Sequence, residues 1–507
     1  MLAHLPALVE RGVDHDESLT LITIAGLADM NFPEAAVSIA ELKARFAATI
    51  DFSTIGDDLR RRDVHPPLYF WALKAWADLT SNTLFWLRFF STLCWFISMF
   101  VIHQICKLQK VDRREELFVI AFSSAMSGCF FFSVEARPYL FVNLLLLLQF
   151  WFRVRVNFET KRKYIPFWNF GEATVLGLSL LTNFLGGFIG ALMISIFSLI
   201  ELARAQTSRR RFEILLSKAV SLVPLILSAI LVWPYYLAQR HARPDQDHGY
   251  LGPLADLKAV FFNFLKLISA SHSTLEFVAS GAIFGLAVCG LVQMWRRQPE
   301  RRRFLVELFI FLGATVAAVM LMALIIDKHL HRIRYYTMAL PALGWLVSLG
   351  IFYFVAVLKQ SQTFWRSRLA RVLILSTLLW PALHSNWGVE RSRYDFFGGP
   401  FRNLARDNST RCESPCRHLW ILRRGPTRDL AASLIIEAKA KDNLRVLVWS
   451  EPYLIEDLKT EIAQSDFIEY FGSHDEDGPN KLSLQKHLSE SGFQTQMNLW
   501  SLVANRN

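Results

Sequence analysis

The sequence is poor in charged residues and in cysteine. Charged side chains make up 20% of its 507 residues, against roughly 25% in an average soluble domain, and only 6 residues are cysteine. So few cysteines in a long chain exclude a disulfide-stapled miniprotein, and a hydrophobic fraction of 53% excludes a disordered chain. Internal repeats and low-complexity tracts are also missing. The chain is instead rich in aromatics, with 41 Phe and 15 Trp, and this argues against an ordinary cytosolic enzyme.

Long apolar stretches are the main feature of the pattern. A membrane-spanning helix needs roughly 20 mostly apolar residues. The stretch 171–203 is long enough to be one helix, but Asn183 followed by Gly186 and Gly187 favours a turn and hence two passes. We predict an all-α polytopic membrane protein with about ten spans and additional interfacial helices. The candidate spans are 84–106, 117–133, 138–152, 171–185, 186–203, 213–237, 275–295, 304–326, 334–357 and 372–388.

The distribution of basic residues predicts the orientation of these spans. The formal net charge of +11 on its own suggests a nucleic-acid partner. One set of short loops, however, holds 22 Lys and Arg, whereas the opposite set holds about seven. Such an excess marks the cytoplasmic side, so the charge is an orientation signal and no nucleic-acid partner is expected. The basic loops are 107–116, 153–165, 204–212, 296–303 and 358–371.

This topology defines two predicted domains. Residues 1–388 form the transmembrane domain, whose first outer segment, 13–83, contains amphipathic helices near 34–48 and 66–77. An outer N-terminus leads us to expect a further spanning helix before Met1, the alternative being a genuine short N-terminus. Residues 389–507 alternate short apolar runs with helical stretches and predict a small soluble α/β domain on the periplasmic side. In that compartment its two cysteines, in the run Cys-Glu-Ser-Pro-Cys, can form a local disulfide.

Two motifs of the first outer segment combine carboxylates with histidine. The run Asp14-His15-Asp16-Glu17-Ser18 precedes an apolar stretch, and its three carboxylates and imidazole can bind a divalent cation or accept a proton from a hydroxyl nucleophile. Helix capping, with Asp14 or Asp16 as N-cap and Glu17 in the first turn, explains the same pattern. Asp63 and His65 follow three arginines and precede two prolines, which hold them on an extended piece. Three outer arginines suit a phosphate or anionic head groups, with an N-cap and a solvated basic run as the alternative.

Two further motifs lie at the ends of predicted spans. Glu135, Arg137 and Tyr139 stand between two spans, where charged side chains are costly unless they are paired or functional. A simple interfacial Glu135–Arg137 pair is the alternative. Arg334 and Tyr335 begin a later span, where the arginine can bind phosphate or extend to lipid head groups. All four motifs map to the outer face, so the pattern predicts a site for an anionic amphiphile.

In order and spacing these motifs resemble those of the GT-C superfamily of membrane glycosyltransferases. The similarity is closest to Rgt-like lipopolysaccharide glycosyltransferases and to the group of protein mannosyltransferases and lipid A aminoarabinose transferases. It covers roughly residues 13–405. The matching segments are Asp16-Glu17-Ser18, His65-Pro66-Pro67-Leu68-Tyr69, Arg88-Phe89-Phe90-Ser91, Glu135-Ala136-Arg137-Pro138-Tyr139, Arg334-Tyr335-Tyr336 with Pro341, and Asp395–Ala405.

The resemblance implies an inverting hexosyl or pentosyl transfer from a polyprenyl-phosphate donor. The acceptor would be a glycolipid, a lipopolysaccharide or another envelope glycan, with protein a lesser candidate. Asp16 would act as the base, Glu17 and His65 would line its pocket, and Arg137 and Arg334 would hold the lipid-linked phosphate. The other substrate-binding residues would be Asp63, Glu135, Tyr139 and Tyr335.

The resemblance also bears on a metal and on location. Some relatives use a divalent cation, so a Mg or Mn site at Asp16 and Glu135 is an expectation. Tyr139 stands where some relatives carry aspartate, which puts such a site in doubt. The implied location is a bacterial inner membrane, with membrane lipids as neighbours and with the site and tail facing the periplasm.

A transporter or flippase of a lipid-linked sugar is the alternative function, although inverted repeats, typical of transporters, are not visible in the sequence. A membrane scaffold whose function lies in the tail is a third hypothesis.

Overall fold

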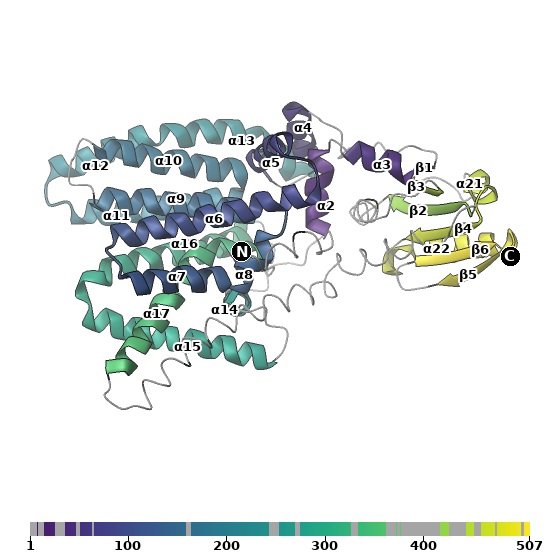
Figure 1. The fold of residues 1–507 in the computed structure, drawn as a ribbon. Helices are drawn as coiled ribbons and strands as arrows, with labels where there is room; N and C mark the ends of the chain where they lie inside the picture. Colours follow the sequence, from purple (N-terminus) through teal and green to yellow (C-terminus); the bar gives the residue numbers. More distant parts are fainter. Residues whose placement is uncertain are drawn as a thin grey trace. The chain divides into compact units, whose positions relative to one another are not determined.

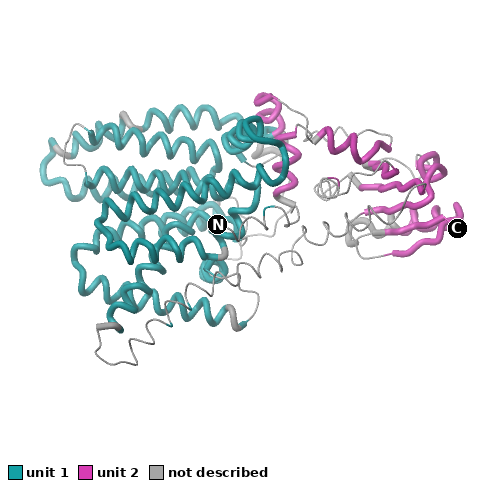
Figure 2. The backbone as a smooth tube through the Cα atoms, in the orientation of Figure 1, with its two compact units in different colours: residues 1–8, 59–389 teal, residues 9–58, 390–507 magenta. Residues whose placement is uncertain are grey.

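The computed structural model divides the chain into two compact units, which are described separately. Unit 1 comprises residues 1–8 and 59–389, and unit 2 comprises residues 9–58 and 390–507 (Figure 2). Residues 9–58 of the outer segment therefore group with the C-terminal tail. The described residues are 8, 15–25, 36–46, 51–62, 65–158, 164–242, 253–268, 274–325, 333–360, 372, 376, 416–424, 435, 443–450, 458–471, 474–497 and 501–506.

Unit 1 is a bundle of long apolar helices (Figure 1). Within the described residues, 7 helical stretches are long and apolar enough to cross a membrane, and each coincides with a predicted span. The chain is thus a multi-span membrane protein. The elements of the bundle are α5 (Leu68–Leu79), α6 (Leu84–Leu108), α7 (Arg113–Ala125), α8 (Ser127–Ser133), α9 (Tyr139–Phe158), α10 (Ile165–Thr182), α11 (Phe184–Arg204), α12 (Ser208–Ser221), α13 (Val223–Ala242), α14 (Pro253–Ile268), α15 (Thr274–Arg297), η2 (Pro299–Arg301), α16 (Arg302–Ile325), η3 (Ile333–Ala339) and α17 (Leu340–Gln360).

Three predicted spans have a different outcome. The stretch 117–133 is not one helix, because Met126 leaves the helical conformation with ψ of 133° and divides it into α7 and α8. The stretch 171–185 lies in α10 and at the start of α11; α10, with 18 residues, falls outside the seven stretches that meet the length and hydropathy requirement. Apart from residues 372 and 376, the stretch 372–388 lies outside the described residues.

The predicted turn at Asn183 is confirmed. Asn183 has extended backbone angles, and its side chain accepts a hydrogen bond from the Gly186 amide at 3.2 Å, which caps the start of α11. The two helices pack tightly just beyond this point, since a Cβ atom on Gly187 would lie 2.8 Å from Cα of Leu180. Small residues of this kind allow helices in lipid to approach closely, and Gly290 and Gly350 do the same where α15 crosses α17.

Unit 2 contains a six-stranded sheet with the strand order β1-β3-β2-β4-β6-β5. The central strand β2 runs parallel to β3 and β4, and the outer pairs are antiparallel. One face packs against α22 through buried Leu419, Ile468, Leu484 and Leu488, which confirms the predicted α/β tail. The elements are α2 (His15–Ile24), β1 (Val37–Ser38), α3 (Ile39–Phe46), α4 (Phe52–Arg62), β2 (His418–Arg424), β3 (Leu444–Ser450), α21 (Lys459–Ala463), β4 (Phe467–Phe471), α22 (His474–Glu490), β5 (Phe493–Met497) and β6 (Ser501–Arg506).

The cysteines differ between the two units. Cys94, Cys106, Cys129 and Cys289 of unit 1 are free thiols, as expected for residues of apolar helices. Cys416 of unit 2 is disulfide-bonded. The sixth cysteine of the chain, at position 412, lies outside the described residues. Stable disulfides are typical of an oxidising compartment.

Candidate functional site

The segment 134–138 is held in place by two hydroxyl groups of α6. Ser91 Oγ donates a hydrogen bond to the carbonyl of Glu135 at 2.6 Å and lies 3.5 Å from that of Arg137. One residue further along α6, Thr92 Oγ1 donates to the carbonyl of Ser133 at 2.6 Å. The segment separates α8 from α9, and within it the Arg137 amide donates to the Glu135 carbonyl at 2.8 Å. The hydroxyls of α6 add bonds to the carbonyls of Ser133 and Glu135 and fix the backbone that carries Glu135 and Arg137.

Three predicted site residues meet at this segment. Glu135, Arg137 and Tyr139 are all buried, at 2%, 3% and 4% exposure. The Arg137 guanidinium carbon lies 5.9 Å from the centre of the Tyr139 ring, a cation–π arrangement. Glu135 lies within electrostatic range of the same phenol. A buried arginine next to a hydroxyl donor and a carboxylate is an arrangement that can bind a phosphate and orient it.

The fourth motif lies on the short helix η3 beside the start of α9. The Arg334 guanidinium carbon lies 5.4 Å from the ring centre of Tyr335, and both side chains are half-buried. The helix η3 packs against α9, which brings the fourth motif, Arg334 and Tyr335, near the third, Glu135, Arg137 and Tyr139. Tyr336 is buried and meets the ring of Phe264 from α14 edge-on at 6.2 Å. Residues far apart in the sequence thus form one polar cluster at the end of the bundle where α9 begins.

His65 precedes α5, whose N-cap is Pro67, and is half-buried. Its ring meets Phe70 edge-on at 6.5 Å. Tyr69 is completely buried and contacts the ring of Phe141 on α9 at 6.3 Å, which ties the start of α5 to the start of α9. His65 is therefore attached to the same end of the bundle as the third motif. The predicted helix over 66–77 is confirmed as α5.

The remaining predicted site residues belong to other parts of the chain. Asp16 and Glu17 lie in the first turn of α2 in unit 2, and Glu17 is fully buried. The Asp16 side chain and the whole of Asp63 lie outside the described residues. Asp51 directly precedes α4, and hydrogen bonds from the Ser53 hydroxyl and from the backbone amide and hydroxyl of Thr54 lower its pKa to about 2.

The expected metal site finds no support in the described residues. Among them, no group of three or more His, Cys, Asp or Glu side chains is placed to hold a metal ion. Arg137 stands two residues after Glu135 on the same short segment, and a cation is a poor neighbour for a metal ion.

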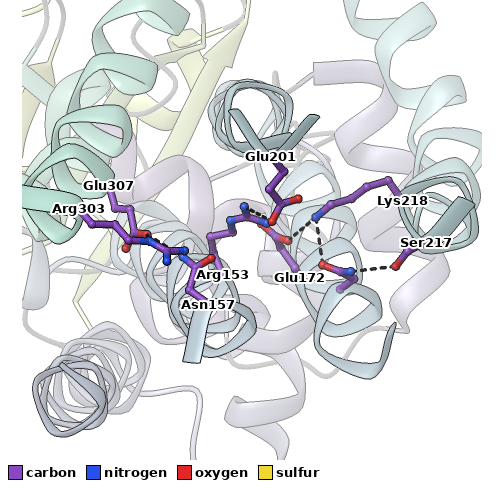
Figure 3. A network of polar contacts seen from close by, with 9 residues as sticks. Arg153, Asn157, Glu172, Glu201, Ser217, Lys218, Arg303 and Glu307 are labelled. Atoms are coloured by element: carbon purple, nitrogen blue, oxygen red, sulfur yellow. Dashed lines mark hydrogen bonds and ion pairs between the residues drawn. The ribbon is translucent and has the colours of Figure 1, made fainter. Parts of the chain in front are cut away.

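A second polar cluster lies at the opposite end of α9 (Figure 3). Arg153 is buried and forms an ion pair with Glu201 of α11 at 2.5 Å, and Asn157 donates to Glu307 of α16 at 2.7 Å. Lys218 of α12 pairs with Glu172 of α10 at 3.4 Å and completes the network. Buried ion pairs of this kind fix the register between helices. The two ends of α9 thus differ: the buried motif residues lie at its start, and the ion pairs that tie helices together lie at its other end.

Sequence reasoning missed the role of Ser91 and Thr92. Ser91 stands in the matching segment that begins with Arg88, yet nothing local indicates which carbonyl it binds. A further omission is Asn143, one helical turn after Tyr139, whose buried amide has no hydrogen-bond partner among the described residues. A Ser-Thr pair and an asparagine inside apolar helices were the available signals.

The fold is similar to that of two solved structures of the membrane protein ArnT. The structure is similar to that of ArnT from Cupriavidus metallidurans in the apo state, with a TM-score of 0.57 at 11% identity over 99% of this chain and 95% of that one. ArnT bound to undecaprenyl phosphate gives a TM-score of 0.55 at 10% identity over 99% and 96% of the two chains. At these identities the likeness concerns the fold alone. No family model and no curated sequence matches the chain.

Proposed function

We propose that the chain transfers a sugar from a polyprenyl-phosphate donor to an envelope acceptor, with inversion at the anomeric carbon. The observation that carries this proposal is the fold shared with ArnT over nearly the whole of both chains. One of the ArnT structures holds undecaprenyl phosphate, the type of carrier proposed here. The buried Arg137 supplies the matching chemistry in this chain, because such a carrier is a lipid with an anionic head.

Arg137 and Arg334 are the proposed phosphate-binding residues. When the sugar leaves its carrier, negative charge grows on the phosphate, and preorganised cations stabilise that charge in the transition state. A guanidinium group can contact two phosphate oxygens at once. Tyr139 and Tyr335 lie next to these arginines and hold the guanidinium planes. Desolvation of Arg137 strengthens its interaction with the phosphate.

The acceptor hydroxyl is activated by a carboxylate. A hydroxyl is a weak nucleophile until its proton is accepted, and Asp16 is the proposed base, with Glu17 and His65 beside the acceptor. The oxygen then forms its bond to the anomeric carbon while the carbon–phosphate oxygen bond breaks on the opposite face. The electron pair leaves with the polyprenyl phosphate, and the proton stays on the carboxylate. A single displacement of this kind inverts the anomeric centre.

The reaction is proposed to take place on the outer, periplasmic face of a bacterial inner membrane. The basic loops support this orientation, because they lie at the other ends of the helices. The disulfide at Cys416 adds independent support for the tail. Cysteine labelling from outside tests it: Asp63→Cys should react, and Pro299→Cys should be protected. The reverse pattern contradicts the orientation.

Reconstituted protein provides the functional test. Proteoliposomes receive polyprenyl-phosphate hexoses, pentoses or aminopentoses together with lipid A or lipopolysaccharide. Transfer is read as the release of free polyprenyl phosphate and as the mass gained by the acceptor. A transporter would instead move the intact donor across the bilayer without cleavage. Full transfer by the Asp16→Asn variant would remove the proposed base.

Measurements of donor affinity distinguish the proposed phosphate-binding arginines from the proposed base. Arg137→Ala and Arg334→Ala should each weaken donor binding, because one charged hydrogen bond contributes about 1.5–3 kcal/mol, or roughly ten- to a hundredfold. Arg209→Ala is the matched control, since that side chain is 89% exposed at the basic end of α12. Asp16→Asn should bind donor normally. Unchanged affinity in both arginine variants would exclude them from the phosphate site.

A further inference from the structure

Two residues of the first outer segment form a strand of the C-terminal sheet. Val37 pairs with Val446, and Ser38 pairs with Arg445, in antiparallel register. The strand β1 is thus the edge strand next to β3, and α3 follows it directly (Figure 1). A pairing of two residues gives few ladder hydrogen bonds, so side-chain contacts must support it.

An ion pair on the tail binds both backbone groups of Ala36, the residue before β1. Arg445 Nη2 donates to the Ala36 carbonyl at 2.6 Å, and the Ala36 amide donates to Glu461 Oε1 at 3.4 Å. Arg445 and Glu461 hold each other through Nη1 and Oε2 at 3.0 Å. We call these two residues the clamp. The clamp recognises main-chain atoms, so it fixes the position of the strand whatever the side chain at Ala36.

Apolar contacts add to the clamp. Ala36 belongs to the same buried apolar cluster as Leu419 and Leu447 of the sheet. Ile39 and Leu42, three residues apart on one face of α3, are 0% and 1% exposed. The segment from Ala36 to Leu42 is therefore a structural part of the tail domain, although it belongs to the first outer segment in the sequence.

The same compact unit contains α2, which carries two of the proposed site residues. Asp16 and Glu17 lie in its first turn, and residues 25–35 connect it to Ala36. An anchor so soon after α2 limits how far that helix can move. Catalytic groups must be held within about 0.5 Å of their productive geometry, so a limit of this kind affects rate.

We propose that the C-terminal domain is a positioning element, whose clamp holds the outer segment and thereby fixes α2 with Asp16 and Glu17. The anchoring of α2 by the clamp does not depend on the proposed function, whereas the effect on catalysis rests on the proposed sugar transfer. Arg445 and Glu461 bond to protein atoms and to each other, so they are positioning residues. The tail then contributes to catalysis in the same chain, beyond any role in acceptor binding.

Hydrogen exchange tests the anchoring without any assay of activity. In the full-length Arg445→Ala protein in detergent, amides of residues 15–24 and 36–46 should exchange at least about tenfold faster, because the local opening costs less free energy. The control is Arg417→Ala, which removes another tail ion pair, to Asp466, whose side chains are 59% and 36% exposed. The proposal is overturned if the amides of residues 15–24 exchange at the wild-type rate in Arg445→Ala. It is also overturned if Arg417→Ala accelerates their exchange as much as Arg445→Ala does.

A cross-link then tests the effect on catalysis. We expect Arg445→Ala to lower kcat for sugar transfer about tenfold at an unchanged donor KM, because the base is displaced while the phosphate site is intact. Val37→Cys with Val446→Cys, added to this variant, should form a disulfide across the strand pair and restore kcat on oxidation. Wild-type protein under the same redox conditions controls for the native disulfide.

The outcomes distinguish the two proposals. If the wild-type protein transfers no sugar, the proposed function fails, and the hydrogen-exchange result still decides the anchoring. If wild-type protein is active and the oxidised cross-link does not restore Arg445→Ala, positioning fails while the proposed function stands. A purely structural role predicts a loss of folded protein with no change in kcat per folded molecule, and that result also overturns the proposal.

Discussion

Replacing Ser91 by alanine tests how the buried motif between α8 and α9 is held. The Ser91 hydroxyl is the donor 2.6 Å from the Glu135 carbonyl. Without it this buried carbonyl keeps only the bond from the Arg137 amide at 2.8 Å, and the loss of one hydrogen bond costs about 0.5–1.5 kcal/mol. The segment can recover part of this energy only by moving, and Arg137 moves with it. If about 1.4 kcal/mol of transition-state stabilisation is lost, kcat/KM for the donor falls roughly tenfold.

Ser98→Ala is the matched control for this prediction. Ser98 also lies on α6 and is buried, but its hydroxyl donates to the carbonyl of Cys94 in the same helix at 2.8 Å. Both variants lose one buried hydroxyl, whereas only Ser91 contacts the motif. The assay is kcat/KM in proteoliposomes, with thermal unfolding in detergent as a check on folding. Equal kcat/KM in Ser91→Ala and Ser98→Ala would refute the reasoning.

Three further predictions concern stability. Arg153→Ala should destabilise the protein by about 2–3 kcal/mol in thermal unfolding. The cost is smaller than for a fully buried ion pair because the partner, Glu201, is 26% exposed. The control Arg209→Ala, which breaks an exposed pair, should cost under about 1 kcal/mol. Gly187→Leu should reduce the yield of folded protein because there is no room for a side chain, whereas Gly313→Leu, with nothing within 4 Å of its Cβ position, should fold normally. The carboxyl of Asp51 should titrate near pH 2 by carbon-13 NMR, so its capping contribution is complete above about pH 4 and is lost as the pH falls through 2; titration near pH 4 would contradict the cap.

Helix boundaries were predictable where a local signal exists and not where tertiary packing decides. Asn183 can cap a helix by itself, and the turn there followed from the sequence. The break at Met126 has no such residue at the break itself. It depends on packing, since a Cβ atom on Gly128 would lie 2.7 Å from Leu267 of α14 and 2.9 Å from Leu340 of α17. No window of local sequence contains those two partners.

The candidate site was predictable as a set of motifs but not as a geometry. Glu135, Arg137 and Tyr139 were found together because they are adjacent in the sequence and because charge is costly in an apolar setting. Their support by Ser91 joins residues 44 positions apart, and a serine in a helix more often bonds within its own helix, as Ser98 does. The sequence thus indicates which residues carry chemistry, while the residues that hold them require the structure.

The strand β1 shows the same limit at the longest range. Amphipathic spacing predicted a helix over 34–48, and the structure confirms it only from Ile39, because Val37 and Ser38 form a strand instead. Two residues are too few to show the alternating hydrophobic pattern of a strand. The hydrogen bond that favours the strand, from Arg445 to the Ala36 carbonyl, joins residues 409 positions apart. If the clamp matters for function, residues 445 and 461 should vary together among related sequences, while the side chain at 36 need only remain small enough for the apolar core. Independent variation at 445 and 461 would mean that the main-chain contacts are incidental and that the apolar packing of α3 alone holds the segment.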